Sequence, residues 1–243
     1  MRQSRRQPLP NRQSARSPRQ TVAVPTRLPS RPAPPQNAAP IRLTPWPPRQ
    51  APAIIGIGSS TGGPQALFEV FKALAPGLHV PVVITQHMPP TFTAILADHL
   101  ARQTNLPCKE AADREVLRPG HIYVAPGDHH LLVEKKGHDA VARVVQTPPE
   151  NFCRPAVDPM FCSLAKAFGE RVLCIVLTGM GQDGTLGARD IIAHGGALVA
   201  QDEATSVVWG MPGSVAKAGL CNAVLPLQDI GPTLHGLLTG GAS

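Results

Sequence analysis

Short apolar runs alternate with segments of helical periodicity from residue 53 onward. The runs at 54–57, 80–86 and 172–177 have the length of a buried strand. Between them, as in 64–75, apolar residues recur every three or four positions, which is the spacing of an amphipathic helix. This alternation predicts an α/β fold, a doubly wound and mostly parallel sheet with helices on both faces.

The middle of the chain follows a different pattern. Turn residues separate three short β-type segments, at 122–124, 131–133 and 141–145. We expect an antiparallel excursion there and not another strand-helix-strand unit. Asp128-His129-His130 lies in the first of these turns, where adjacent histidines are typical of a solvated surface. Because no third ligand stands at a suitable spacing, we expect no metal site.

The first 50 residues differ sharply from the rest in composition. They contain twelve prolines, ten arginines and no Asp, Glu or Lys, so they carry a charge of +10 and leave the remainder at −3. Such a segment has too little apolar surface to form a core. We therefore expect residues 1–52 to be a disordered basic tail that contributes little to folding, and 53–243 to be one domain. A solvated arm and a docking segment for an acidic protein, nucleic acid or anionic membrane both stay open.

Targeting signals and cysteine usage favour a cytoplasmic location. The chain has no apolar core of a secretory signal and no run of about eighteen apolar residues, which a membrane span needs. Five cysteines, an odd number, never stand in C-x-x-C spacing. They indicate reduced thiols and argue against structural zinc.

The candidate chemistry begins in the turn after the first apolar run. Residues 58–62, Gly-Ser-Ser-Thr-Gly, match the G-x-S-x-G pattern, in which small residues let a strained turn expose a serine, here Ser60. A helix beginning near Pro64 would direct free N–H groups and a positive dipole end at that serine. The turn alone leaves a nucleophile and a structural or phosphate-binding loop equally open. A Walker A loop is excluded because no Lys-Ser or Lys-Thr follows.

Two further polar side chains follow predicted strands. His87 comes directly after 80–86, and Asp183 lies in a glycine-rich turn after 172–177. The carboxyl ends of parallel strands meet at one edge of a sheet, so Ser60, His87 and Asp183 are expected to converge. They are the residue types of an acyl-transfer triad. We expect Asp183 to accept the Nδ1–H of His87, which leaves Nε2 to take the serine proton.

Five ordered motifs resemble the catalytic domain of chemotaxis protein-glutamate methylesterases, the CheB family. They are Ser60-Thr61-Gly62-Gly63, Gln86-His87-Met88-Pro89 with Phe92-Thr93, Arg154-Pro155 with Val157-Asp158, Gly179-Met180-Gly181 with Asp183-Gly184, and Val207-Val208 with Gly210-Met211-Pro212. The resemblance covers about residues 53–230. It implies hydrolysis of glutamate γ-methyl esters on the helical cytoplasmic region of chemoreceptors, with release of methanol and often with deamidation of receptor glutamines.

The resemblance also implies a role for each site residue. Ser60 matches the nucleophile, His87 the general base and Asp183 the orienting acid. Thr61 and Met180 match positions whose backbone N–H groups are candidates for the oxyanion hole. No cofactor or metal is implied. The implied partner is the methylated chemoreceptor helices, with no obligatory nucleic acid and no membrane span.

Regulation and substrate are less closely defined. Usual family members carry a phosphorylatable receiver domain ahead of the esterase, whereas residues 1–50 contain no acidic phosphoacceptor. We therefore expect activity that does not respond to small phosphodonors, and a receiver protein acting in trans stays open. A non-catalytic module that binds receptor helices, and an esterase or amidase with a substrate outside chemotaxis, are the alternatives.

Overall fold

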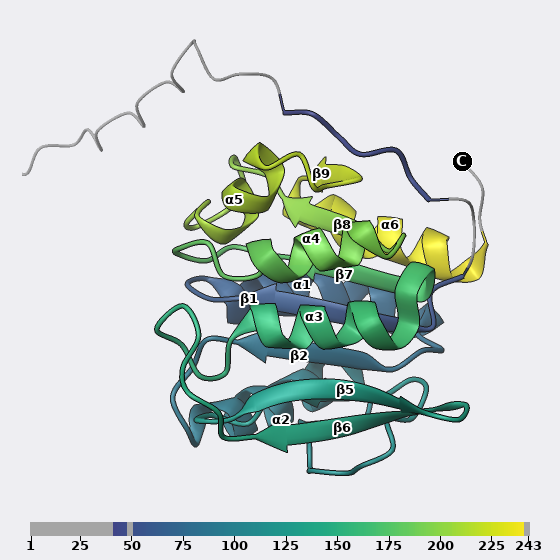
Figure 1. Ribbon diagram of the computed structural model, residues 1–243, viewed down its shortest axis with the longest axis vertical. Helices are drawn as coiled ribbons and strands as arrows, with labels where there is room; N and C mark the ends of the chain where they lie inside the picture. The colour runs from purple at the N-terminus through teal and green to yellow at the C-terminus, as the bar shows by residue number, and fades with distance from the viewer. Residues whose placement is uncertain (1–40, 48–50, 241–243) are drawn as a thin grey trace, which may run out of the picture. The chain divides into compact units, whose positions relative to one another are not determined.

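The computed structural model describes residues 41–47 and 51–240 (Figure 1). Its main sheet has seven strands in the order β3-β4-β2-β1-β7-β8-β9, and every neighbouring pair is parallel. The strands are β1 (Ile54–Ser59), β2 (Val82–Gln86), β3 (Cys108–Glu110), β4 (Ile122–Val124), β7 (Val172–Val176), β8 (Ala197–Gln201) and β9 (Ala223–Leu225). The predicted fold class, a doubly wound and mostly parallel sheet, is confirmed.

Helices cover both faces of this sheet. They are α1 (Gly63–Leu74), α2 (Phe92–Thr104), α3 (Val157–Phe168), α4 (Thr185–Ala193), α5 (Met211–Lys217) and α6 (Leu227–Thr239), with short 3₁₀ turns η1 (Ala75–Gly77) and η2 (Gly169–Arg171). Helices α1, α2 and α6 bury their apolar residues in one core, and α3, α4 and α5 pack in a second core on the opposite face (Figure 1). Within the described ranges, no helix is long and apolar enough to cross a membrane.

The antiparallel excursion is smaller than predicted. Among the strands of the described residues, β5 (His130–Lys136) and β6 (Asp139–Val145) alone pair with each other antiparallel, and this pair packs against α3. The prediction was wrong for 122–124, because β4 is parallel to both β2 and β3 in the main sheet. Its partner strand β3 has only three residues, too few for a period-2 pattern to show in the sequence.

The expectation that both turn histidines are solvated was wrong for His130. Its side chain is fully buried. Nδ1 accepts from the N–H of Ala156 at 3.1 Å, and Nε2 donates to the carbonyl of Pro148 at 3.1 Å. A buried imidazole with both nitrogens bonded is a structural group. It fixes the segment 146–156 against the start of β5.

Two glycines in β1 allow α3 to lie close to the sheet. A Cβ on Gly56 would come within 2.5 Å of Leu164, and one on Gly58 within 2.6 Å of Val157. These approaches are shorter than any ordinary carbon contact, so a larger residue would push α3 away. Because Val157 begins α3, Gly58 also determines how close that helix start lies to the end of β1.

Residues 41–47, which belong to the predicted tail, bind the domain. The N–H of Thr44 donates to the carbonyl of Cys221 at 2.8 Å, and its Oγ1 donates to the carbonyl of Gly219 at 2.9 Å. The side-chain amide of Asn222 donates to the carbonyls of Thr44 and Pro45. Residues 1–40 and 48–50 lie outside the described residues, so the predicted tail and its boundary at residue 52 stay a prediction.

Two deletions separate these parts of the tail. Removing residues 1–40 is expected to leave Tm unchanged, because their composition cannot form a core. Removing residues 1–47 is expected to lower Tm measurably, since each of the four lost hydrogen bonds contributes about 0.5–1.5 kcal/mol. Thermal unfolding followed by circular dichroism makes the comparison. Equal Tm values for the two deletions would contradict a stabilising role for residues 41–47.

Candidate functional site

The first two candidate residues lie side by side at the carboxyl edge of the sheet. Strands β1 and β2 are parallel, and their last registered pair is Ser59 with Gln86. Ser60 directly follows the last residue of β1, and His87 directly follows the last residue of β2. The N–H of His87 donates to the carbonyl of Ser59 at 3.0 Å, so the pairing continues to the residue that precedes each turn. Sequence order alone, strand followed by turn, therefore brings serine and histidine together.

The two adjacent serines have different environments. Ser59 is fully buried, and its hydroxyl donates to Gln86 Oε1 at 2.7 Å. Ser60 is half-buried. Its backbone is held by the carbonyl of Thr178, which accepts from its N–H at 3.0 Å, and by Gln86 Nε2, which donates to its carbonyl at 2.9 Å. Of the two hydroxyls, that of Ser60 is the one that a substrate can reach.

His87 contacts Asp183 through a short hydrogen bond. The distance from Nε2 to Asp183 Oδ2 is 2.6 Å, and the exposed fractions of the two side chains are 11% and 2%. The expectation that Asp183 binds Nδ1 is wrong, because the ring presents Nε2 to the carboxylate. Nδ1 is therefore the nitrogen left for a proton from Ser60. In this conformation no hydrogen bond joins Ser60 to His87 among the described residues, and such catalytic bonds often tighten only around substrate.

Asp183 is held as a carboxylate by five donors. Besides His87, they are three backbone N–H groups and one side-chain amide, from Val157, Asp158, Gly184 and Asn151 Nδ2, at 2.6 to 3.1 Å. Burial raises the pKa of Asp183, but the hydrogen bonds from His87 and Val157 outweigh it and lower the pKa below its ordinary value. The carboxylate stays charged and can stabilise a charged imidazole.

Neighbouring Asp158 has the opposite character. Burial raises the pKa of this carboxyl, the N–H of Gly187 lowers it, and the charge of Asp183 raises it again. Asn151 Nδ2 donates to Asp158 Oδ2 at 2.8 Å and to Asp183 Oδ1 at 2.9 Å, so the amide bridges the two carboxyls. The pKa of Asp158 is therefore raised while that of Asp183 is lowered, so the shared environment drives the two carboxyl groups apart in pKa.

Sequence reasoning missed Asn151 and Cys153 as parts of this site. The Sγ of Cys153 lies 3.5 Å from Nδ1 of His87, at the nitrogen that Asp183 leaves free. Burial, followed by the charge of Asp183, raises the pKa of this thiol. It therefore remains protonated, and in this conformation its weak S–H points at the Nδ1 lone pair, a contact that it must give up when Ser60 passes its proton to that nitrogen. No spacing signal links Cys153 to His87 in the sequence.

The five cysteines form no disulfide; two are buried and three half-buried.

Two backbone N–H groups beside Ser60 are available to an oxyanion. Thr61 follows the serine directly, and Met180 lies in the turn after β7. In the described part of the chain, neither N–H donates to another group. Gly179, which precedes Met180, lies against Ser60: a Cβ built on it would be 2.8 Å from the Cβ of Ser60. The turn that carries Met180 thus lies against the turn of Ser60, and the oxyanion hole formed by Thr61 and Met180 stays a prediction.

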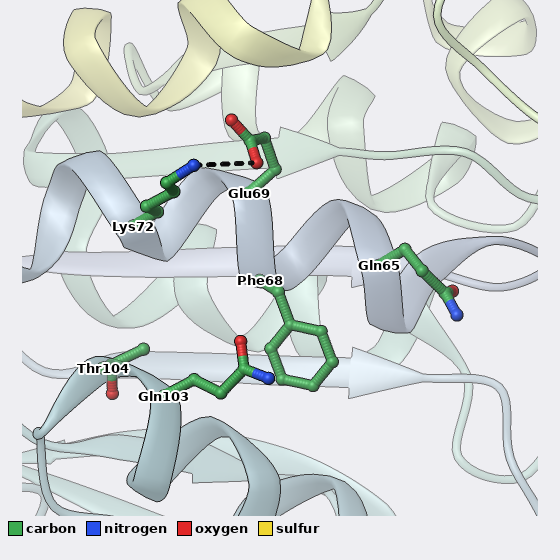
Figure 2. Close-up of a pocket in the computed structure, with 6 residues that line it drawn as sticks. All are labelled: Gln65, Phe68, Glu69, Lys72, Gln103 and Thr104. Carbon is green, nitrogen blue, oxygen red and sulfur yellow. Dashed lines mark ion pairs between the residues drawn. The ribbon is translucent and has the colours of Figure 1, made fainter.

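A pocket of about 330 Å³ lies elsewhere, between α1 and α2. It is lined by Gln65, Phe68, Glu69, Lys72, Gln103 and Thr104, and Figure 2 shows the Phe68 ring near Gln103 with the Glu69–Lys72 ion pair beside them. None of these residues belongs to the cluster around Ser60, so we assign the pocket no part in the chemistry. Among the described residues, no group of three or more His, Cys, Asp or Glu side chains could hold a metal ion.

Known proteins are similar to this chain in sequence. The family model described as CheB methylesterase matches residues 55–234. A protein of Paramagnetospirillum magneticum named protein-glutamate methylesterase/protein-glutamine glutaminase 1 is 55% identical over 208 residues, which are 84% of this chain and 54% of that protein. A protein of Azospirillum brasilense with the same name, without the number, is 58% identical over 185 residues, which are 76% and 47% of the two chains. This chain therefore spans about half the length of these relatives.

A solved structure extends the likeness to the fold. The crystal structure of the catalytic domain of the CheB methylesterase from Thermotoga maritima superposes with a TM-score of 0.75 at 39% identity. The match covers 77% of this chain and 100% of the other.

Proposed function

Because the chain belongs to the CheB methylesterase family, we propose that its domain is a serine hydrolase that removes methyl esters from glutamate side chains of chemoreceptor-type proteins. One observation carries the proposal: Ser60 and His87 continue a registered pair of neighbouring strands, and buried Asp183 binds the far nitrogen of the His87 ring at 2.6 Å. This arrangement orders a nucleophile, a base and an orienting acid.

In the first half of the reaction, Ser60 Oγ attacks the γ-carbonyl carbon of the methyl ester while Nδ1 of His87 takes its proton. The carbonyl oxygen becomes an oxyanion, which the N–H groups of Thr61 and Met180 bind. Asp183 stabilises the charged imidazole. Nδ1 then gives its proton to the methoxy oxygen, the C–O bond breaks and methanol leaves an acyl-enzyme on Ser60.

In the second half of the reaction, water is the nucleophile and Ser60 is the leaving group. Nδ1 of His87 takes a proton from water, the hydroxide attacks the acyl carbon, and the ester bond to Ser60 breaks as its Oγ regains the proton. The product is a glutamate carboxylate. A glutamine side chain would follow the same route with ammonia as leaving group, which corresponds to the second activity in the relatives' names.

The partner and location follow from this substrate. We propose that the partner is a chemoreceptor whose methylated cytoplasmic helices carry the ester. Five free cysteines fit the reducing cytoplasm. A receiver protein acting in trans is a separate part of the proposal.

Release of methanol from a methylated chemoreceptor cytoplasmic fragment tests the function. We expect steady methanol release by the wild-type chain and covalent labelling of Ser60 by a fluorophosphonate. Labelling without methanol release would indicate an esterase with another protein substrate, and the assay would then be repeated on other methyl-esterified proteins. Absence of both in a folded chain would contradict a hydrolase and favour a binding module.

A further inference from the structure

The turn that precedes α3 is a tight two-residue hairpin. The N–H of Glu150 donates to the carbonyl of Cys153 at 3.0 Å, and the N–H of Cys153 donates back to the carbonyl of Glu150 at 2.8 Å. Its two central residues have positive φ, 49° for Asn151 and 63° for Phe152. A turn of this form requires left-handed backbone at both positions and therefore favours Asn followed by Gly. Asn151 fits the preference, whereas Phe152 stands where glycine would be most stable.

Nothing in the fold compensates for this choice of residue. The relative exposure of Phe152 is 104%, so its ring packs on no other part of the described chain. Left-handed backbone is unfavourable for a bulky side chain, and such strain persists where the surroundings hold the residue in place. Here both neighbours are held: Asn151 bridges Asp158 and Asp183, and Cys153 contacts His87. The turn thus presents an unburied aromatic ring next to the catalytic base.

Further exposed apolar side chains stand around the same site. Val207 reaches the turn of Ser60, since a Cβ on Gly62 would lie 2.7 Å from it. Met180 and Leu186 flank Asp183 in sequence and are also exposed. Segments 60–65 and 177–186 contain no ionisable side chain apart from the buried Asp183. Exposed apolar side chains grouped beside a reactive centre are typical of a surface that binds protein.

We propose that Phe152 is a specificity-determining anchor that packs into an apolar surface of the protein substrate, next to the esterified glutamate. The inference rests on the proposed function. A glutamate side chain is short, so the protein that carries the ester must come close to His87. Cys153, the residue after Phe152, contacts His87, so that protein also comes close to the Phe152 turn. A small ester reaches Ser60 without covering the ring, whereas a protein buries it. Aromatic side chains that become buried in this way dominate the energetics of many interfaces.

Phe152→Gly tests the anchor, because glycine keeps the turn and relieves its strain. We compare kcat/KM for methanol release from a methylated chemoreceptor fragment with kcat/KM for p-nitrophenyl acetate. The ratio of the two is expected to fall about tenfold or more in Phe152→Gly, the loss that truncation of an interface anchor produces. Phe152→Tyr, which keeps the ring, is expected to restore the ratio to near the wild-type value. Tm of Phe152→Gly should equal or exceed that of the wild type.

Val116→Ala is the matched control. Val116 is an exposed apolar residue that pairs with Val141, away from the turns around Ser60, and its truncation should leave the ratio unchanged. An unchanged ratio in Phe152→Gly would overturn the anchor while leaving the proposed function intact. A wild-type chain that hydrolyses p-nitrophenyl acetate but releases no methanol from the methylated fragment would overturn the proposed function, and this inference with it.

Discussion

Ser60→Ala is expected to lower kcat for methyl-ester hydrolysis by about 10⁶, the loss that removal of the nucleophile causes in serine hydrolases. The variant keeps the N–H groups of Thr61 and Met180, so it should still bind substrate. Methanol release under saturating substrate gives kcat, and a fluorophosphonate should no longer label the chain. Turnover in Ser60→Ala close to the wild-type rate would show that another group attacks the ester.

Ser59→Ala is the matched control, with the same chemical change one residue earlier. Because the Ser59 hydroxyl is buried and donates to Gln86, it cannot attack a substrate. We expect most of the activity to remain. The variant leaves Gln86 Oε1 buried without its donor, which costs about 1–3 kcal/mol of the free energy of unfolding. In thermal unfolding, we therefore expect the active variant Ser59→Ala to have a lower Tm than the inactive variant Ser60→Ala.

The placement of Ser60, His87 and Asp183 at one edge of the sheet was predictable because Ser60 and His87 directly follow parallel strands and Asp183 lies in the turn after a third. Strand periodicity gives the position of each turn, and the parallel arrangement places all three turns at one edge. The predicted contact between His87 and Asp183 is present at 2.6 Å. The roles of Ser60, Thr61 and Met180 stay predictions that the variants above test.

The remaining parts of the site depend on contacts that no local pattern records. Cys153 reaches His87 because the segment before α3 is tied down at two distant points. Arg154 donates to Asp128 through Nε at 2.9 Å, and His130 donates to Pro148 from within the core. The partners in these two pairs lie 26 and 18 residues apart in sequence, respectively. The orientation of the His87 ring was missed for a similar reason, since it follows from where Asp183 lies relative to β2.

Asp183→Asn is expected to lower kcat by about 10⁴, as the equivalent change does in a serine protease, or roughly 5.5 kcal/mol of transition-state stabilisation. In the wild type, Nε2–H donates to the carboxylate and Nδ1 keeps its lone pair for the serine proton. An asparagine that turns its NH₂ group toward His87 would favour the other tautomer. Nδ1 would then carry the proton and could not act as the base.

The substitution also affects stability, because every partner of Asp183 is a donor. Oδ1 accepts from Asp158, Gly184 and Asn151, and Oδ2 from His87 and Val157. Whichever position the new NH₂ takes, it faces at least one N–H group, and an unpaired buried donor costs about 1–3 kcal/mol. The loss of kcat must therefore be measured on the folded fraction, determined by circular dichroism at the assay temperature.

Asp190→Asn provides the control for a nearby carboxylate. Asp190 lies on α4 about two turns beyond Asp183, and its backbone carbonyl accepts a hydrogen bond from His194. Its side chain has no contact with His87 among the described residues, so kcat should stay within a few-fold of the wild type. Full activity in folded Asp183→Asn would mean that the orienting carboxylate is not Asp183. Asp158 would then be the group to replace next, because Asn151 links it to the same cluster.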